Sequence, residues 1–258
     1  MANQEGDNEP TIVVGRRPVF ELIRDAAREV DKVLIKQGTG GGAIADIRRM
    51  AHERGIQVQF VPASRLDRLA GGAGHQGVAA FSAPIPYLDL HELLQDAAPD
   101  LDTTRQTKPV LLLLDGIQDP HNFGAILRTA AATGVNGVVV PRHGMAPLGA
   151  VTVKASAGTA GRVPIARVGN LADTLYPLKE RGFWILGASG EGAESVWDVD
   201  VDRPLAIVIG SEGSGLGKRI AGECDHLVQI PMRGDVESLN ASVAAGVILF
   251  IATRTRLG

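Results

Sequence analysis

The second half of the chain alternates short apolar runs with helical segments, and this alternation constrains the fold more than any other feature. The runs, each mostly apolar, fall at 110–114, 137–140, 162–165, 183–186, 205–209 and 227–230. The first of them, Val-Leu-Leu-Leu-Leu, is typical of a strand buried on both faces. Strands that alternate with helices predict a parallel, doubly wound α/β sheet. Ligands of such sheets bind at the carboxyl ends of the strands, so we expect a functional site in the loops that follow these runs.

The first half of the chain shows a similar alternation on a smaller scale. Apolar spacing predicts helices and strands in turn, at 19–26, 32–35, 44–51, 56–61, 64–71 and 78–81. We therefore expect an acidic, disordered tail over 1–10, a small α/β domain over 11–96, a polar linker over 97–108 and a larger α/β domain over 109–258.

Composition excludes several classes of protein. The 26 basic and 29 acidic side chains leave a net charge of −3, so nucleic acid binding would need a local patch, for which adjacent arginines are candidates. Cys224 is the single cysteine and the six histidines lack ligand spacing, so we expect no disulfide and no metal site. The longest apolar run, 241–252, is shorter than the ~20 residues of a membrane span. We expect a cytoplasmic protein without a signal peptide.

The loop after residues 110–114 leads into a helix. Asp119 is a good N-cap and Pro120 is favoured at the first helical position, which predicts a helix from about 120 to 133. Helical spacing places Arg128 beneath a polar first turn that contains Asn122, near the carboxyl end of a strand. On spacing alone, an ordinary surface arginine on an amphipathic helix is the favoured explanation of Arg128, and a helix-start role is enough to explain Asn122.

A glycine-rich loop at 209–219 follows the apolar run at 205–209. Its glycines let backbone N–H and C=O groups approach a ligand closely. The Walker pattern is absent, because Lys218 is followed by Arg219 instead of Ser or Thr, and Gly-x-Gly-x-x-Gly is absent too. Glu212 therefore indicates a backbone-rich ligand site that is not a phosphate loop, with a loop carboxylate in water as the alternative.

The third loop connects the apolar run at 227–230 to a C-terminal helix. Ser238 or Asn240 can cap this helix, and capping alone is enough to explain either residue. Small residues along the helix favour close packing on a neighbour. Three of its later apolar residues are expected to face the core: Val243, Val247 and Phe250.

Together the three loops resemble, in order and in spacing, the three motifs of the SpoU-type RNA ribose 2′-O-methyltransferases of the SPOUT superfamily. The matching segments are 122–129, 210–215 and 230–240, within residues 108–256. Two segments of the first half, 14–23 and 74–79, are similar to the L30e-like substrate-binding domain of the bacterial enzymes that methylate a guanosine ribose in 23S rRNA. The resemblance covers nearly the whole chain.

This resemblance implies a fold, a cofactor and partners. The parallel sheet of the second domain would be tied in a deep trefoil knot that binds S-adenosylmethionine, and this domain would form a homodimer. The first domain would hold the RNA. The implied reaction is 2′-O-methylation of a guanosine ribose in 23S rRNA near the peptidyl-transferase centre, with no metal and no membrane involved. The arginines expected to contact RNA are Arg16, Arg17, Arg48 and Arg49.

The resemblance also implies the residues of the site. Those that would contact the cofactor are Gly210, Ile230, Met232 and Leu239, and those that would act in catalysis are Asn122, Arg128, Glu212, Ser238 and Asn240. Arginine stays protonated in proteins, so we expect Arg128 to hold a phosphate and polarise the hydroxyl instead of acting as a free base. The alternatives are a tRNA ribose as the target, a non-catalytic RNA-binding protein, and a nicotinamide- or nucleotide-dependent α/β enzyme.

Overall fold

The computed structural model divides the chain into two compact units, Met1–Pro86 with Pro147–Ala150, and Tyr87–Ala146 with Val151–Gly258. The structure describes residues 12–25, 30–70, 74–82, 85–190, 192, 194–213, 215–234 and 238–256. Residues 1–10, for which a disordered tail was predicted, lie outside the described residues.

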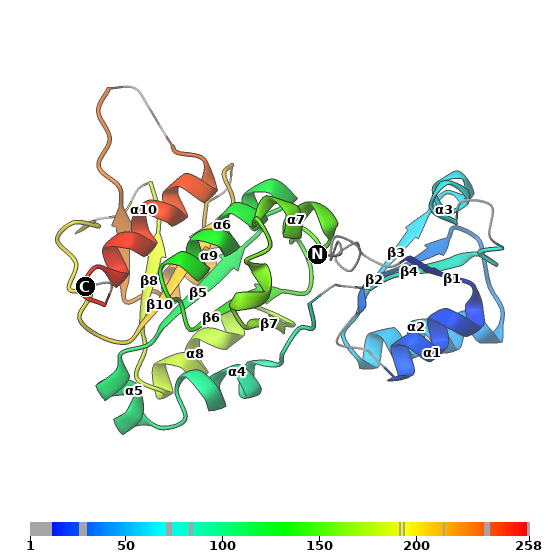
Figure 1. Ribbon diagram of the computed structural model, residues 1–258, viewed down its shortest axis with the longest axis horizontal. Coiled ribbons are helices and arrows are strands. Elements are labelled where there is room, and N and C mark those ends of the chain that lie inside the picture. The colour runs from blue at the N-terminus through cyan, green and yellow to red at the C-terminus, as the bar shows by residue number, and fades with distance from the viewer. Residues whose placement is uncertain are drawn as a thin grey trace, which may run out of the picture. The chain divides into compact units, whose positions relative to one another are not determined.

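The first unit has three layers, with a four-stranded mixed sheet in the middle (Figure 1). Its elements are β1 (Ile12–Val14), α1 (Arg16–Asp25), β2 (Val30–Lys36), α2 (Gly42–Glu53), β3 (Gln57–Val61), α3 (Ala63–Ala70) and β4 (Val78–Ser82). The strand order is β1-β4-β2-β3, in which only β2 and β3 are parallel. Apolar residues of α1 and α2, such as Ile23 and Ile47, cover one face, and Leu66 of α3 covers the other.

The second unit contains a seven-stranded sheet, which is parallel at every pairing. Its strands are β5 (Val110–Asp115), β6 (Gly137–Pro141), β7 (Ile165–Val168), β8 (Trp184–Ala188), β9 (Glu194–Ser195), β10 (Leu205–Gly210) and β11 (His226–Gln229), in the order β7-β6-β5-β10-β8-β11-β9. The predicted parallel α/β fold is thus confirmed. The trefoil knot stays a prediction of the resemblance.

Helices cover both faces of this sheet (Figure 1). They are α4 (Leu90–Ala97), α5 (Leu101–Thr107), α6 (Pro120–Ala132), α7 (Ala150–Ala155), α8 (Ala172–Glu180), α9 (Lys218–Glu223) and α10 (Ala241–Thr253), with a 3₁₀ turn at Ala160–Arg162. Leu111 and Leu113 join the core formed with α4, α8 and α9. Side chains alternate along a strand, so the buried Leu112 and Leu114 face the opposite layer, where α6 packs against α10. No helix of the described segments is long and apolar enough to cross a membrane.

Two local expectations are wrong. The strand expected at 162–165 begins only at Ile165, because Pro164 has no N–H to donate to a ladder and residues 160–162 form the 3₁₀ turn. On α10, the side chains of Val243 and Phe250 are half exposed instead of facing the core. This helix is apolar on every side, so periodicity does not select the face that the sheet buries.

The segment 97–108 also differs from the linker that its polar composition favoured. Asp100 caps α5 by accepting a hydrogen bond from the Thr103 N–H at 2.8 Å. This bond and a second one from the Thr103 hydroxyl lower the pKa of Asp100. Ala98 is buried in the core of the second unit, and Arg181 donates to the Pro99 carbonyl at 2.9 Å. The division of the chain therefore falls between Pro86 and Tyr87, and 97–108 belongs to the second unit.

This difference has a measurable consequence for stability. A fragment of residues 87–258 should unfold cooperatively, whereas a fragment of residues 108–258 should be less stable by at least about 3 kcal/mol. The shorter fragment lacks the buried Leu93 and Leu94, and burying one leucine side chain contributes about 1.5–3 kcal/mol. Urea unfolding followed by circular dichroism measures the difference. Equal stability of the two fragments would instead support the predicted linker at 97–108.

Candidate active site

A cavity of about 520 Å³ lies at the carboxyl ends of β8, β10 and β11, within the size range of small-molecule sites. Three loops and the start of α10 form its wall. The lining residues that the sequence had already indicated are Gly210, Glu212, Ile230, Met232, Ser238 and Leu239. The expectation that the site follows the apolar runs is in agreement with this position.

The glycine-rich loop folds back over the end of β10. A Cβ atom at Gly210 would lie 2.2 Å from the backbone of Gly215, so only glycine fits there. The Gly215 N–H donates to the Ser211 carbonyl at 3.0 Å, and the Gly217 N–H donates to Asp115 Oδ2 at 3.1 Å. The backbone of this loop is therefore held against β5 and β10 and forms one wall of the cavity.

A single carboxylate oxygen joins the three sequence motifs. Glu212 Oε1 accepts hydrogen bonds from Asn122 Nδ2 at 2.9 Å, from Asn240 Nδ2 at 2.5 Å and from the Ala241 N–H at 3.0 Å. Asn240 Nδ2 also donates to Asn122 Oδ1 at 3.0 Å. Glu212 is exposed, but its Oε1 is bound by three protein donors, which a free loop carboxylate would lack. It holds the first turn of α6, the glycine-rich loop and the start of α10 together.

Asn240 combines this role with capping of α10, for which the sequence had offered Ser238 or Asn240. Its Oδ1 accepts from the backbone N–H of Ser242 at 2.9 Å and of Val243 at 3.3 Å. Asp119 likewise caps α6, with its Oδ1 accepting from the His121 N–H at 2.9 Å, and Pro120 opens that helix. Two helix starts are therefore fixed beside the cavity.

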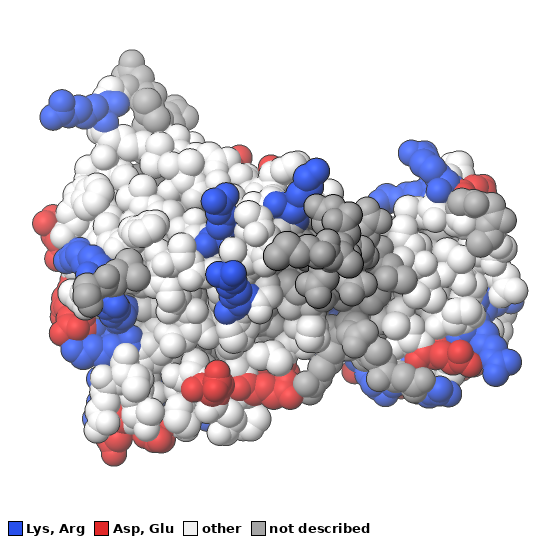
Figure 2. All heavy atoms as spheres, viewed as in Figure 1, with Lys and Arg blue, Asp and Glu red and all other residues white. Residues whose placement is uncertain are grey.

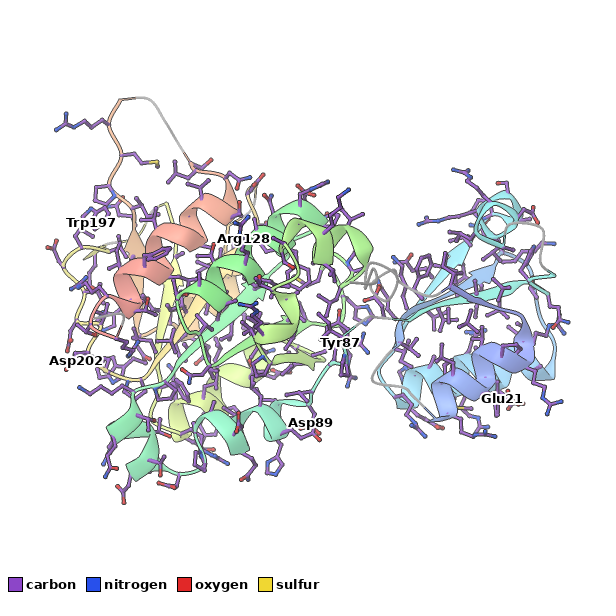
Figure 3. The ribbon with its side chains drawn as sticks, in the orientation of Figure 1. Glu21, Tyr87, Asp89, Arg128, Trp197 and Asp202 are labelled. Atoms are coloured by element: carbon purple, nitrogen blue, oxygen red, sulfur yellow. The ribbon has the colours of Figure 1, made fainter. Side chains whose placement is uncertain are left out.

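Arg128 lies on α6 and is exposed (Figure 3). It is not among the residues that line the cavity, and no carboxylate of the described segments lies within ion-pair distance of it. One turn earlier, Gly124 packs so closely on α7 that a Cβ atom there would lie 2.4 Å from the Thr152 carbonyl oxygen. The structure thus brings Asn122, Glu212 and Asn240 into contact and leaves the guanidinium of Arg128 available to a ligand.

Sequence reasoning missed the part of the wall that follows β8. Ala188, Ser189 and Gly190, at the end of β8, line the cavity. Leu216 and Lys218, in the glycine-rich loop, line it too and had not been singled out as site residues. The signal was present, because residues 187–190 read Gly-Ala-Ser-Gly directly after an apolar run.

The four arginines expected to contact RNA lie in the first unit and differ in their surroundings. Arg17 pairs with Glu21 at 3.0 Å, and Arg49 pairs with Asp46 at 3.2 Å. The guanidinium of Arg48 lies 5.4 Å from the centre of the Phe60 ring. Arg16 donates its Nε to the Gln76 carbonyl at 3.1 Å.

Nucleophilic catalysis by cysteine does not fit this structure. Burial, followed by the neighbouring Asp225, raises the pKa of the Cys224 thiol to about 11, and its Sγ donates to the Ile220 carbonyl at 3.2 Å. The thiolate is the reactive form, so this thiol is inert at neutral pH. Among the residues that the structure describes, no group of His, Cys, Asp and Glu is arranged to hold a metal ion.

The Glu212 contacts predict strong energetic coupling between motifs that are far apart in the sequence. In a double-mutant cycle, Glu212→Ala and Asn240→Ala should interact by about 0.5–3 kcal/mol, because each removes the partner of the other. Urea unfolding of the two single variants and the double variant gives this energy. Thr107→Ala on α5 serves as the control, and should be additive with Glu212→Ala within about 0.5 kcal/mol. Additivity of the Glu212 and Asn240 changes would contradict the shared-carboxylate arrangement.

Two family models match most of this chain. The SpoU rRNA Methylase family model matches residues 109–250, and the model for RNA 2′-O ribose methyltransferase substrate binding matches residues 12–88. A TrmH family relative from Staphylococcus haemolyticus (strain JCSC1435) is 43% identical over 248 residues, covering 96% of this chain and 97% of its own. A TrmH family relative from Bacillus subtilis (strain 168) is 39% identical and covers 95% of each chain.

Solved structures of SpoU and TrmH enzymes superpose on this chain. The SpoU methyltransferase AviRb from Streptomyces viridochromogenes superposes with a TM-score of 0.60 at 25% identity, over 96% of this chain and 90% of that one. The TrmH/SpoU tRNA modifying enzyme of A. aeolicus superposes with a TM-score of 0.53 at 31% identity, over 65% of this chain and 82% of that one. Since the methylase model spans more than half of the sequence and the relatives align over nearly all of it, this chain belongs to the SpoU rRNA methylase family of RNA 2′-O-ribose methyltransferases.

Proposed function

We propose that this protein methylates, in the cytoplasm, the ribose 2′-hydroxyl of a guanosine in 23S rRNA near the peptidyl-transferase centre, with S-adenosylmethionine as the methyl donor. The observation that carries the proposal is the Glu212 carboxylate, which joins the three family motifs at the mouth of a cavity large enough for the cofactor. The family membership supports the reaction class, and the names of the relatives, which mention both tRNA and rRNA, make a tRNA ribose the second candidate.

The cavity suits S-adenosylmethionine. Ile209, Ile230 and Leu239 offer an apolar wall for a purine ring, with Gly210 and Met232 beside them, and Lys218 offers a cation for a carboxylate. AviRb, whose fold this chain shares, has been determined in complex with AdoMet. When bound, the cofactor supplies an activated methyl group.

The side chains of this chain would then position the RNA. Arg128 would bind a phosphate beside the target ribose and polarise its 2′-hydroxyl, whose proton would pass to solvent water at this exposed position. Its guanidinium stays protonated and presents a planar set of donors, which suits a phosphate and not the role of a free base. Asn122, Glu212 and Asn240 hold the surrounding loops in place, and Ser238, which lines the cavity, would contact the ribose.

The surface around α6 supports the approach of RNA. On the face seen in Figure 2, Lys and Arg side chains lie over α6 and α7 without an acidic side chain between them. Such a surface attracts a phosphate backbone even though the whole chain carries a net charge of −3. RNA is the expected substrate because only RNA has a 2′-hydroxyl, and the match of residues 12–88 to a substrate-binding model supports a role for the first unit in holding the RNA.

We propose that a second copy of this chain covers the exposed face of α10. The side chains of Val243 and Phe250 are 51% and 52% exposed and lie seven residues apart, on one side of a helix that packs against α6. Phe250→Glu should therefore convert a dimer to a monomer in sedimentation velocity, because it would bury a charge at the interface. Trp197→Glu changes an equally exposed side chain elsewhere and should leave the dimer intact. A dimer that survives Phe250→Glu would place the interface on another surface.

The proposed reaction is tested with the purified chain, radiolabelled S-adenosylmethionine, and transcripts of bacterial 23S rRNA and tRNA. The wild type should methylate one guanosine ribose of the 23S transcript, mapped by a stop in reverse transcription at low nucleotide concentration. Arg128→Ala and Arg128→Lys should both lose at least about 100-fold in rate, because a compact ammonium cannot reproduce the planar donor set.

Cofactor affinity of the Arg128 variants should stay within a few-fold of wild type, since Arg128 does not line the cavity. Labelling of tRNA instead of 23S rRNA would favour the tRNA alternative. Binding of RNA without any transfer would favour the non-catalytic alternative. An active Arg128→Lys variant would show that charge alone is sufficient at this position.

A further inference from the structure

A second cavity, of about 600 Å³, lies in the first unit, where the start of α1, the end of β2 and the loop before β4 meet. It is lined by Arg16, Lys36, Thr39, His75, Gln76 and Gly77. Among the four arginines considered above, Arg16 alone is one of these lining residues. Neither the family motifs of the second unit nor the residues expected to contact the cofactor have a part in it.

The floor of this cavity is built from backbone held in an uncommon conformation. Gln76 has a φ of 49° and Gly77 a φ of 83°, both in the left-handed region. The Lys36 N–H donates to the Gly77 carbonyl at 2.9 Å, and a Cβ atom at Gly77 would lie 2.9 Å from Thr39 Cγ2. Non-glycine residues adopt such a φ only where their surroundings impose it, and residues in this conformation cluster at functional sites.

Arg16 is tied to this floor by two hydrogen bonds. Its backbone N–H donates to Gln76 Oε1 at 3.2 Å, and its Nε donates to the Gln76 carbonyl at 3.1 Å. The first bond uses the oxygen of the Gln76 amide and leaves its NH₂ group as a donor. The second orients the guanidinium and leaves its two terminal nitrogens as donors.

The cavity carries positive charge without a lining carboxylate. Arg16 and Lys36 are its cations, and neither forms an ion pair with a described residue. The nearby Asp67 carboxylate lies outside the lining and accepts from His75 Nε2 at 3.0 Å, while His75 Nδ1 accepts from the Gly77 N–H at 2.9 Å. The polar groups left for a ligand are therefore mostly donors, which is the chemistry of an anion site.

We infer that this cavity binds a backbone phosphate of the RNA substrate, through the Arg16 guanidinium and the Lys36 ammonium. The inference rests on the proposed function, since it assigns a contact to the RNA that the first unit would hold. Arg17 and Arg49 fit this role less well, because each already pairs with a carboxylate on its own helix. A phosphodiester also matches the fork geometry of an oriented arginine.

The test measures binding of the full chain to a fluorescent transcript of the peptidyl-transferase region of 23S rRNA as a function of salt. Each phosphate contact contributes about 0.7–0.9 to the slope of log affinity against log salt. Lys36→Gln should lower the slope by about that amount, and Lys36→Gln with Arg16→Gln by about twice as much. Lys36 is exposed at the end of its strand, so its replacement should leave the fold intact.

Arg54→Gln is the matched control, because it removes one positive charge from the same unit at the opposite end of the sheet. Arg54 precedes β3, whose first residue pairs with Lys32, whereas Lys36 pairs with the last residue of β3. The control should keep the wild-type slope. An unchanged slope for Lys36→Gln, or an equal decrease for Arg54→Gln, would overturn the assignment.

Transfer of the methyl group by the wild-type chain is the measurement that separates this inference from the proposed function. If wild type transfers no methyl group but Lys36→Gln still lowers the slope selectively, the reaction is wrong and the phosphate site is right. If wild type transfers the methyl group and the slope does not change, the reaction is right and the site is wrong. A wild-type chain that binds no RNA overturns both.

Discussion

The parallel pairing of β5 with β10 is the interaction on which the rest of the second unit depends. The two strands align from Val110 with Leu205 to Asp115 with Gly210, so they end at the same edge of the sheet. Chain segments that lie about ninety residues apart in sequence are thereby brought within hydrogen-bond reach. Because both strands are buried on both faces, a slip by one residue would expose apolar side chains on each side, and the register is strongly specified.

The Glu212 carboxylate turns this shared edge into a site. One of its oxygens receives three N–H groups from two helix starts, so the loops cannot move independently without breaking hydrogen bonds to a charged group. Beside these contacts, the cavity wall combines the glycine-rich backbone at 210–213 and 215 with apolar side chains such as Ile209 and Leu239. Preorganised loops reduce the cost of ordering at the moment of binding, and positioning of this kind is a major source of rate in group transfer.

Under the proposed function, the two units would present arginine to an anionic partner in different ways. The second unit presents Arg128 on the outer surface of a helix, where no described carboxylate competes for it. The first unit presents Arg16 in a cavity, with its guanidinium oriented by the backbone of the Gln76 turn. Arg17 and Arg49, on the first two helices, are instead paired with acids on their own helices, and exposed pairs of that kind contribute little to stability and lower the local positive charge. Local geometry, and not net charge, therefore selects the residues that suit a phosphate.

Local sequence was enough to predict the parallel α/β fold, a helix start at Asp119, a second helix start at Ser238 or Asn240, and two of the loops that line the cavity, those after β10 and β11. Each of these depends on local chemistry, such as strand periodicity, capping and glycine content, and is readable from neighbouring residues. The tertiary structure alone decided that Glu212 binds Asn122 and Asn240, that residues 97–108 pack into the second unit, and that Val243 and Phe250 are left half exposed. These outcomes depend on which face of an element meets a neighbour distant in sequence, and neither polar composition nor an apolar pattern that surrounds a whole helix contains that information.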